Sequence, residues 1–147
     1  MNDTILKIIG SVRYATISTV DTNNNPWAAP VWYVYDDETI YWWSPIESQH
    51  SKNIEHNSNV YITIFDSTVP EGDGLGVYIS AVASEVESDS LDQVIELYNN
   101  STKIFKLNPE NTSGDAPTRL YKAVIKSSWI NSSSETNGAY TDTRISS

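Results

Sequence analysis

A short polar segment that follows an aromatic run gathers the side chains best suited to binding an anion. Ser44 comes directly after Tyr41-Trp42-Trp43 and is followed by Pro45 and, three positions after Ser44, by Glu47. This order predicts a helix with Ser44 as N-cap, a proline in the first helical position and a capping-box glutamate. Backbone N–H groups and the positive end of the helix dipole gather at such a start, and with the hydroxyls of Ser44 and Ser48 they could hold a phosphate. A capping box alone also explains the pattern, so both interpretations stay open.

The predicted helix runs to about residue 57 and carries one mixed face. Helical spacing brings apolar ends and a polar centre together, and this face consists of Ile46, Gln49, His50, Asn53 and Ile54. A helix with a purely structural role more often buries an unbroken apolar stripe. The polar centre therefore indicates that Gln49 and His50 face something polar.

Other site chemistry has little support in the sequence. The chain has no cysteine, which excludes disulfides, thiolate catalysis and cysteine metal sites. His50 and His56 are six apart, the wrong spacing for two ligands on one helix face, so we expect no metal site. The glycine-rich run over residues 72–76 precedes a predicted strand and lacks the Lys-Ser or Lys-Thr of a phosphate loop. No order of Ser, His and Asp resembles that of a hydrolase.

Short strands joined by turns are predicted to position the polar segment. Alternating, β-branched residues indicate strands over residues 12–20, 27–35, 39–43, 60–65, 76–86 and 119–130. Helical spacing indicates further helices over residues 3–10 and 90–98, the second with a capping-box pattern at Ser90. Pro30 cannot donate to a sheet ladder, so we expect a sheet edge or a bulge there. Hairpin-linked strands with marginal helices predict a mainly β fold, a six-stranded antiparallel barrel.

The composition fits a single domain that binds a small molecule or another protein. The chain has 147 residues, of which 39% are apolar and 11% aromatic, enough for a sizeable core. Lys and Arg number 9 against 19 Asp and Glu, and the net charge of −10 opposes attachment to nucleic acid or an anionic membrane. The first residues lack the apolar run of a signal peptide and no run could span a membrane, so we expect a cytoplasmic protein.

Several segments in succession resemble one known family. They are Ala15-Thr16-Ile17-Ser18-Thr19-Val20-Asp21, Pro26 to Tyr33, Ile40-Tyr41-Trp42-Trp43-Ser44, Ser48 to Ile54, Asn57 to Val60, Gly76-Val77-Tyr78-Ile79 and Ala81 to Val86. In order and spacing this succession resembles the pyridoxamine 5'-phosphate oxidase-like flavoproteins, well over residues 12–86 and more loosely beyond. The resemblance implies a split β-barrel of the FMN-binding type, a homodimer, and FMN held in grooves at the subunit interface. We therefore expect one FMN-binding domain over residues 1–147, with the barrel over about 12–130 and a polar tail over 131–147.

The resemblance also implies which residues hold the cofactor. The strand around Ala28, Ala29, Pro30 and Val31 would lie along the flavin ring. The phosphate would lie against Trp43, Ser44, Ser48, Gln49 and His50, where His50 stands at the position that is commonly lysine in the family. Lys52 or Arg144 would then supply positive charge, as would Lys103. Trp129 and Arg144 resemble the C-terminal Trp and Arg that approach the flavin in true pyridoxamine phosphate oxidases.

The predicted function is that of an FMN-dependent oxidoreductase acting on an unknown small substrate. Vitamin-B6 oxidation is disfavoured, because the Arg-x-His signature is absent from the tail and Tyr33 stands where those oxidases carry a substrate-binding lysine. One alternative is a non-catalytic module of the same fold that binds a flavin, a deazaflavin or haem. Another is a dimeric interaction domain with a degenerate site.

Overall fold

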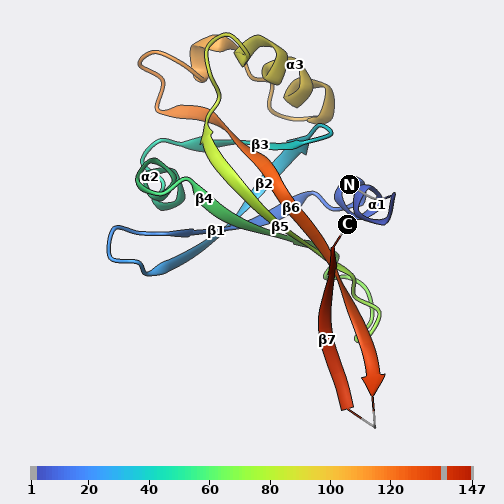
Figure 1. Cartoon of the computed structure of the whole chain (residues 1–147). Coiled ribbons are helices and arrows are strands. Elements are labelled where there is room, and N and C mark those ends of the chain that lie inside the picture. Colours follow the sequence, from blue (N-terminus) through green and yellow to red (C-terminus); the bar gives the residue numbers. More distant parts are fainter. Residues whose placement is uncertain (1–2, 137–138, 147) are drawn as a thin grey trace.

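The alternating stretches of the sequence form seven strands, which helices cover at the margins (Figure 1). The computed structural model describes the backbone of residues 3–136 and 139–146, and the side chains of these residues except 132–142. In chain order the elements are α1 (Asp3–Ser11), β1 (Tyr14–Val20), β2 (Pro26–Tyr35), β3 (Thr39–Pro45), α2 (Gln49–His56), β4 (Asn59–Phe65), β5 (Gly76–Glu85), α3 (Leu91–Ser101), the 3-10 turn η1 (Pro109–Asn111), β6 (Thr118–Thr136) and β7 (Ala139–Ser146).

Strands β1 to β6 close into an antiparallel barrel. The sheet order is β3-β2-β1-β4-β5-β6-β7, and a further pairing between β3 and β6 joins its ends. All strand pairs are antiparallel. The predicted mainly β, six-stranded antiparallel barrel is confirmed.

Two apolar cores hold the strands and helices together. The first fills the barrel with inward side chains that alternate along each strand, among them Ile17, Trp42 and Ile62, each with no exposed surface. The second lies outside the barrel, where α3 packs on β2, β3 and β6 through Val94, Tyr98 and neighbouring residues. Burying each large apolar side chain contributes about 1.5–3 kcal/mol. Successive residues of β2 and β3 therefore face different cores, which sets the direction of every site residue on these strands.

The predicted helix start at Ser44 is wrong. Ser44 and Pro45 belong to β3, because they pair with Arg119 and Thr118 of β6. The helix begins only at Gln49, with Ser48 as its N-cap and no side-chain capping hydrogen bond. Pairing with a distant strand outweighs the local capping pattern here.

The capping box predicted at the start of the third helix is also absent. Ser90 is the N-cap of α3 but makes no capping hydrogen bond from its side chain. Its hydroxyl donates to Asp89 instead, at 3.3 Å. The helix itself forms where it was predicted, and it extends to Ser101.

A hairpin of β6 and β7 occupies most of the segment predicted as a polar tail. β6 continues to Thr136 and pairs with β7 from Trp129↔Ser146 to Thr136↔Ala139. Figure 1 shows this hairpin projecting away from the barrel. The strand predicted over residues 119–130 is the first part of β6, but serine and threonine in place of apolar residues concealed its continuation and β7. The pattern that predicts a strand is the alternation of apolar with polar side chains.

Candidate functional site

The end of β3 and the start of α2 bring three hydroxyls and one imidazole into contact. Nε2 of His50 lies 2.9 Å from Ser44 Oγ and 3.2 Å from Ser48 Oγ. Ser48 Oγ also lies 2.8 Å from Ser51 Oγ. We call Ser44, Ser48, His50 and Ser51 the serine–histidine cluster. Three of the residues predicted to contact a phosphate thus lie together.

The tautomer of His50 sets the direction of its hydrogen bonds with the serines. The Ser48 hydroxyl donates to the carbonyl oxygen of Pro45, at 2.9 Å. With a hydrogen on Nε2, His50 donates to one of the serine oxygens; in the other tautomer Nε2 accepts from a hydroxyl such as that of Ser44. In the first tautomer the cluster offers an N–H donor to an anion.

Burial keeps this imidazole neutral. His50 is 9% exposed and Ser44 5%, whereas Ser48 is partly exposed and joins the cluster to the surface. Loss of solvation lowers the pKa of His50 from its ordinary value of 6.5. Among the described residues, no ion pair or hydrogen bond joins a charged side chain to the cluster. The donor set fits a phosphate, but the cluster contains no permanent cation to balance the phosphate charge.

Polar contacts fix α2 against the barrel. Asn53 Nδ2 donates to Thr19 Oγ1 of β1 at 2.9 Å, and both residues are buried. Gln49 Nε2 donates to Asn53 Oδ1 at 2.7 Å. The polar centre predicted for this helix thus faces polar partners, and Gln49 supports Asn53 instead of lying in the cluster.

Lys52 points away from the cluster into solvent. Its ammonium forms an ion pair with Glu47 at 2.7 Å, and the two side chains are 51% and 83% exposed. Glu47 is therefore the partner of Lys52, not a capping residue. A positive charge so exposed and already paired adds little to a site one turn away.

One edge of β2 is open where the sequence predicts contact with a flavin ring. Ala28, Ala29, Pro30 and Val31 pair with β1 on one side. On the other side, pairing with β3 extends only over Tyr33–Tyr35. Among the residues that the structure describes, none pairs as a strand with residues 28–31 along this edge, in keeping with the edge expected at Pro30.

Trp129 and Arg144 form a second group, on the outer face of β4 and β5. The Arg144 guanidinium lies 4.2 Å from the ring centroid of Tyr78 and 5.4 Å from that of Tyr61. Trp129 stacks on Tyr61, with centroids 6.3 Å apart. None of the contacts described for this group involves the serine–histidine cluster, so the described contacts do not join the two sets of predicted residues within one chain.

The structure also places Trp43 and Tyr33, two residues that the sequence analysis had compared with positions of the family's site. Trp43 faces α3 and packs on the outer core, opposite to Ser44, as strand alternation requires. Tyr33 is buried, and its hydroxyl donates to the carbonyl oxygens of Ile9 at 2.8 Å and Val12 at 3.1 Å. It joins the end of α1 to the barrel, so it is not available to a substrate.

Sequence reasoning missed Ser51, Tyr61 and Tyr78. Ser51 had a signal, since it lies three residues after Ser48 and such residues meet on a helix. Tyr61 and Tyr78 had none, because their meeting with Arg144 depends on the register of β4, β5 and β7.

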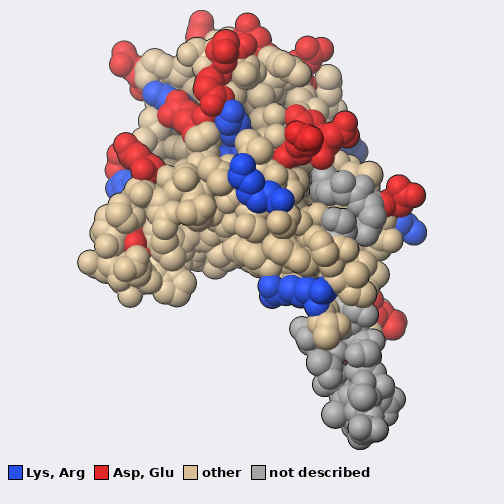
Figure 2. All heavy atoms as spheres, viewed as in Figure 1, with Lys and Arg blue, Asp and Glu red and all other residues tan. Residues whose placement is uncertain are grey.

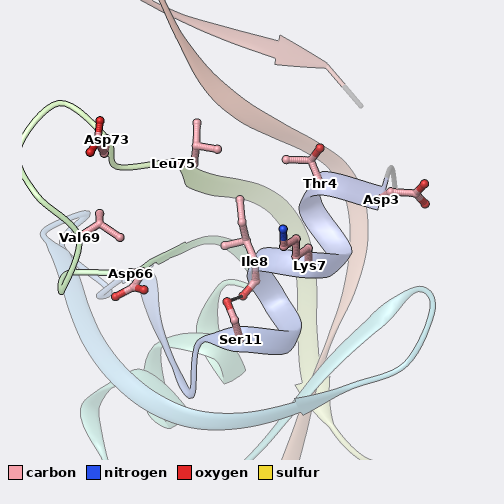
Figure 3. A pocket seen from close by; sticks show the side chains of 9 residues that line it. All are labelled: Asp3, Thr4, Lys7, Ile8, Ser11, Asp66, Val69, Asp73 and Leu75. Atoms are coloured by element: carbon pink, nitrogen blue, oxygen red, sulfur yellow. Dashed lines mark hydrogen bonds between the residues drawn. The ribbon is translucent and has the colours of Figure 1, made fainter.

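A cavity of about 450 Å³ lies between α1 and the loop from β4 to β5 (Figure 3). Figure 3 shows Lys7 and Ile8 of α1 on one side and Val69 and Leu75 of the loop on the other. None of the predicted site residues lines it. No group of three or more His, Asp or Glu in the described part of the chain could hold a metal ion.

The closed six-stranded antiparallel barrel with helices at its margins is the architecture of a split β-barrel. The family model described as Pyridoxamine 5'-phosphate oxidase matches residues 1–127. The chain belongs to this family. Among curated proteins, none matches the sequence.

Solved structures with this fold carry different names. A heme storage protein from Vibrio cholerae shares 23% identity at a TM-score of 0.70, over 84% of this chain and 88% of that one. General Stress Protein 26 from Bacillus anthracis shares 26% identity at a TM-score of 0.65, over 87% and 91%. An F420 reductase shares 14% identity at a TM-score of 0.61, over 83% and 93%. The fold is common to all three, whereas the names of the first and the third refer to different ligands, heme and F420.

No helix in the described residues is long and apolar enough to cross a membrane. Figure 2 shows acidic side chains gathered over the end of the molecule that carries α3. Asp92 and Glu96 of α3 contribute to this charge. An acidic surface repels anionic polymers and lipids.

Proposed function

We propose that the protein binds FMN and acts as an FMN-dependent oxidoreductase on a small substrate. The observation that carries the proposal is the serine–histidine cluster, a set of converging donors at the start of α2. The open edge of β2 and the family of the chain support it.

The phosphate would be held by the serine–histidine cluster. His50 Nε2 and the hydroxyls of Ser44, Ser48 and Ser51 would donate to phosphate oxygens once their present hydrogen bonds, that of Ser48 to Pro45 included, are exchanged. The backbone N–H groups of the first turn of α2 lack partners within the helix and add to them. Neutral donors would thus take the place of the lysine that the family commonly carries.

The flavin ring would lie along the open edge of β2. Ala28 and Pro30 are exposed, and their small side chains leave the backbone accessible to a planar ring. The isoalloxazine supplies the hydride and electron chemistry of such proteins. The role of this chain is to bind and orient it, which requires no acid–base pair among the side chains.

A second subunit would complete the site. Arg144 and Trp129 are predicted to approach the cofactor, yet they form a group of their own on β4, β5 and β7. In a homodimer this group of one subunit can face the serine–histidine cluster of its partner. Tyr61, Tyr78 and Trp129 supply aromatic surface of the kind enriched in protein interfaces.

An FMN titration of matched variants tests the phosphate site. Quenching of flavin fluorescence gives the affinity, and Ser48→Ala combined with His50→Ala should weaken it by about tenfold or more, because donors to a charged group contribute about 1.5–3 kcal/mol each. His56→Ala is the control, since His56 is exposed at the other end of the same helix. Equal affinity in all three proteins would show that the phosphate binds elsewhere.

Reduction assays separate the enzyme from a binding module. A yellow protein whose flavin spectrum bleaches with NADH or NADPH and recovers in air supports the oxidoreductase. A flavin that binds but resists every reductant supports a module, and a colourless protein that takes up no FMN contradicts both.

Haem binding is the second candidate, because a heme storage protein has the same fold at a TM-score of 0.70. A hemin titration distinguishes it, since bound haem gives a sharpened Soret band that free hemin lacks. In that case uptake should survive the Ser48→Ala and His50→Ala changes, because His50 is buried and bonded to serines.

A further inference from the structure

A second cavity, of about 610 Å³, lies on the outer side of the barrel beside the end of α3. Its walls come from four parts of the chain. They include Arg13, Trp32, Trp43, Tyr98, Lys103 and Phe105. We call this space the α3 cavity. It shares Trp43 and Lys103 with the residues predicted to hold FMN, and Trp43 faces away from Ser44 of the serine–histidine cluster.

The walls of the α3 cavity are aromatic and partly fixed in place. Trp32 and Tyr98 meet edge to face, with ring centroids 5.0 Å apart and planes inclined at 69°. Both belong to the outer core, so these rings are held by packing before any ligand arrives. Phe105 also lines the cavity and is 64% exposed. Two rings fixed by packing and a third that is exposed offer flat surfaces to an aromatic ligand.

The charge of the α3 cavity is opposite to that of the whole chain. Arg13 and Lys103 line it, and no Asp or Glu does, although the net charge of the protein is −10. The ion pairs of the described residues engage Lys52, Arg119 and Lys122, so neither Arg13 nor Lys103 has an acidic partner there. Two basic side chains without acidic neighbours favour an anionic ligand.

Local contacts hold the loop after α3 beside the cavity. The Lys106 ammonium donates to the carbonyl oxygens of Asn99 and Thr102. The side chain of Asn99 binds the backbone of Leu107 through both its oxygen and its nitrogen, at 2.7 and 2.8 Å. These bonds hold Lys103 and Phe105, which lie between them in the chain, in a closed loop. The basic and the aromatic side chain are therefore presented together.

We infer that the α3 cavity binds a planar aromatic carboxylate. The ring enters between Phe105 and the Trp32–Tyr98 wall, and the carboxylate meets Arg13 and Lys103. The inference rests on this cavity alone and holds whether or not the serine–histidine cluster takes FMN.

Calorimetry with two probes of one shape tests the inference. 2-Naphthoate and 2-naphthalenemethanol have the same ring system, but only the first is charged. The wild-type protein should bind naphthoate more tightly than the alcohol by about fivefold, the effect of a solvent-accessible ion pair. No heat with millimolar naphthoate, or equal affinity for the two probes, would overturn the inference.

Two sets of variants separate the charge from the ring contact. Arg13→Gln with Lys103→Gln should abolish the preference for naphthoate and leave the affinity for the alcohol unchanged. Phe105→Ala should lower the affinity for both probes by the same factor. Lys126→Gln and Phe65→Ala are matched controls on exposed residues outside the cavity and should change nothing. Equal losses in control and cavity variants would contradict the assignment.

Competition with FMN shows whether the cavity is a separate site. Saturating FMN should leave the affinity for naphthoate unchanged. Competitive displacement of naphthoate by FMN would overturn the inference, because the cavity would then be part of the flavin site. A protein that binds naphthoate but no FMN would refute the proposed function and leave this inference standing.

Discussion

His50 is buried between two serine hydroxyls, and that position decides how its imidazole can serve an anion. Its Nε2 lies within hydrogen-bond distance of Ser44 and Ser48, and burial lowers the pKa of the ring, which favours the neutral imidazole. A neutral donor gives a phosphate direction but little charge. A lysine would give charge, as a permanent cation on a flexible stem.

The substitution His50→Lys should therefore tighten FMN binding. We expect about a tenfold gain, because a hydrogen bond to a charged group contributes about 1.5–3 kcal/mol and part of this is offset by burial of the lysine. Gln49→Lys adds the same charge at the neighbouring exposed position and serves as the control in the same fluorescence titration. An affinity that rises equally in both variants would contradict a specific role of position 50.

The stability of the FMN-free protein should fall in acid through His50. Burial holds the folded-state pKa of His50 below 6.5, so the unfolded chain binds the proton more readily. The stabilisation is fully present above the unfolded pKa and is lost as the pH falls through the folded pKa. Urea unfolding from about pH 7.5 to about pH 5.5 should show a smaller loss for His50→Gln than for the wild type. His56→Gln should retain the wild-type slope, and a wild-type slope in His50→Gln would refute the assignment.

FMN binding should weaken as the pH rises, because the imidazole of His50 then carries a proton less often. An anion beside the imidazole favours its protonated form, so binding of the phosphate and of the proton support each other. The fluorescence titration at mildly acidic and at alkaline pH should give the tighter binding in acid. His50→Gln should remove the difference, and equal wild-type affinity at both pH values would rule out a role for imidazole charge.

At the scale of the element, α2 is a short helix whose position depends on polar contacts as well as on Ile54. Asn53 contacts both Thr19 and Gln49. Asn53→Ala leaves the buried hydroxyl of Thr19 without this partner, so urea unfolding should show a loss of about 1–3 kcal/mol. Asn100→Ala, at an exposed position of α3, is the control and should stay within about 0.5 kcal/mol of the wild type. An equal effect of the two changes would contradict the anchoring role of Asn53.

The strands of the barrel could be predicted because their signal is local. β1 alternates inward Ala15, Ile17 and Thr19 with outward residues, and this alternation is legible without knowledge of the partner strand. The start of α2 could not be predicted in the same way. Residues 44–47 have the sequence pattern of a helix cap. In the structure, Ser44 and Pro45 instead pair with β6, which lies more than seventy positions later in the chain. Pairing between strands so far apart in the chain cannot be predicted from the spacing of neighbouring residues.

At the β6–β7 hairpin, by contrast, the sequence patterns missed strand residues that do form. Its strands are rich in Ser and Thr, so they lack the apolar alternation that marks a half-buried strand. The dipeptide Asn137-Gly138, which lies outside the described residues, is nonetheless the pair most typical of a two-residue hairpin turn. This turn signal was the available clue to the seventh strand.

The candidate site was predictable only in part, for a related reason. Ser44, Ser48 and His50 meet because they are close in the chain, and the family resemblance had grouped them. Arg144 meets Tyr61 and Tyr78 across three strands, and only the register of the finished sheet brings them together.

At the scale of the whole molecule, the two separate groups of predicted residues lead to a test of the dimer. If each FMN site takes its serine–histidine cluster from one subunit and Arg144 from the other, two defective variants can complement each other. A mixture of Ser48→Ala/His50→Ala with Arg144→Ala, after subunit exchange, should regain about a quarter of the sites, since half of the dimers are mixed and each mixed dimer has one intact site. Sedimentation of the wild type should give the mass of two chains.

Each of the two variants by itself is the control for this mixing experiment and should still bind FMN weakly. No gain on mixing, although exchange is shown by differently tagged subunits, would mean that one chain holds the whole site. A monomer at all concentrations would have the same meaning.

The central claim is that the serine–histidine cluster holds the phosphate of FMN, and the comparison of FMN with riboflavin tests it most directly. The two flavins differ only in the phosphate, so the ratio of their affinities isolates that group. The wild type should prefer FMN by at least about tenfold, as donors to a charged group predict. Ser48→Ala with His50→Ala should lose this preference while the affinity for riboflavin stays the same. A preference for FMN that survives in the double variant would contradict the claim.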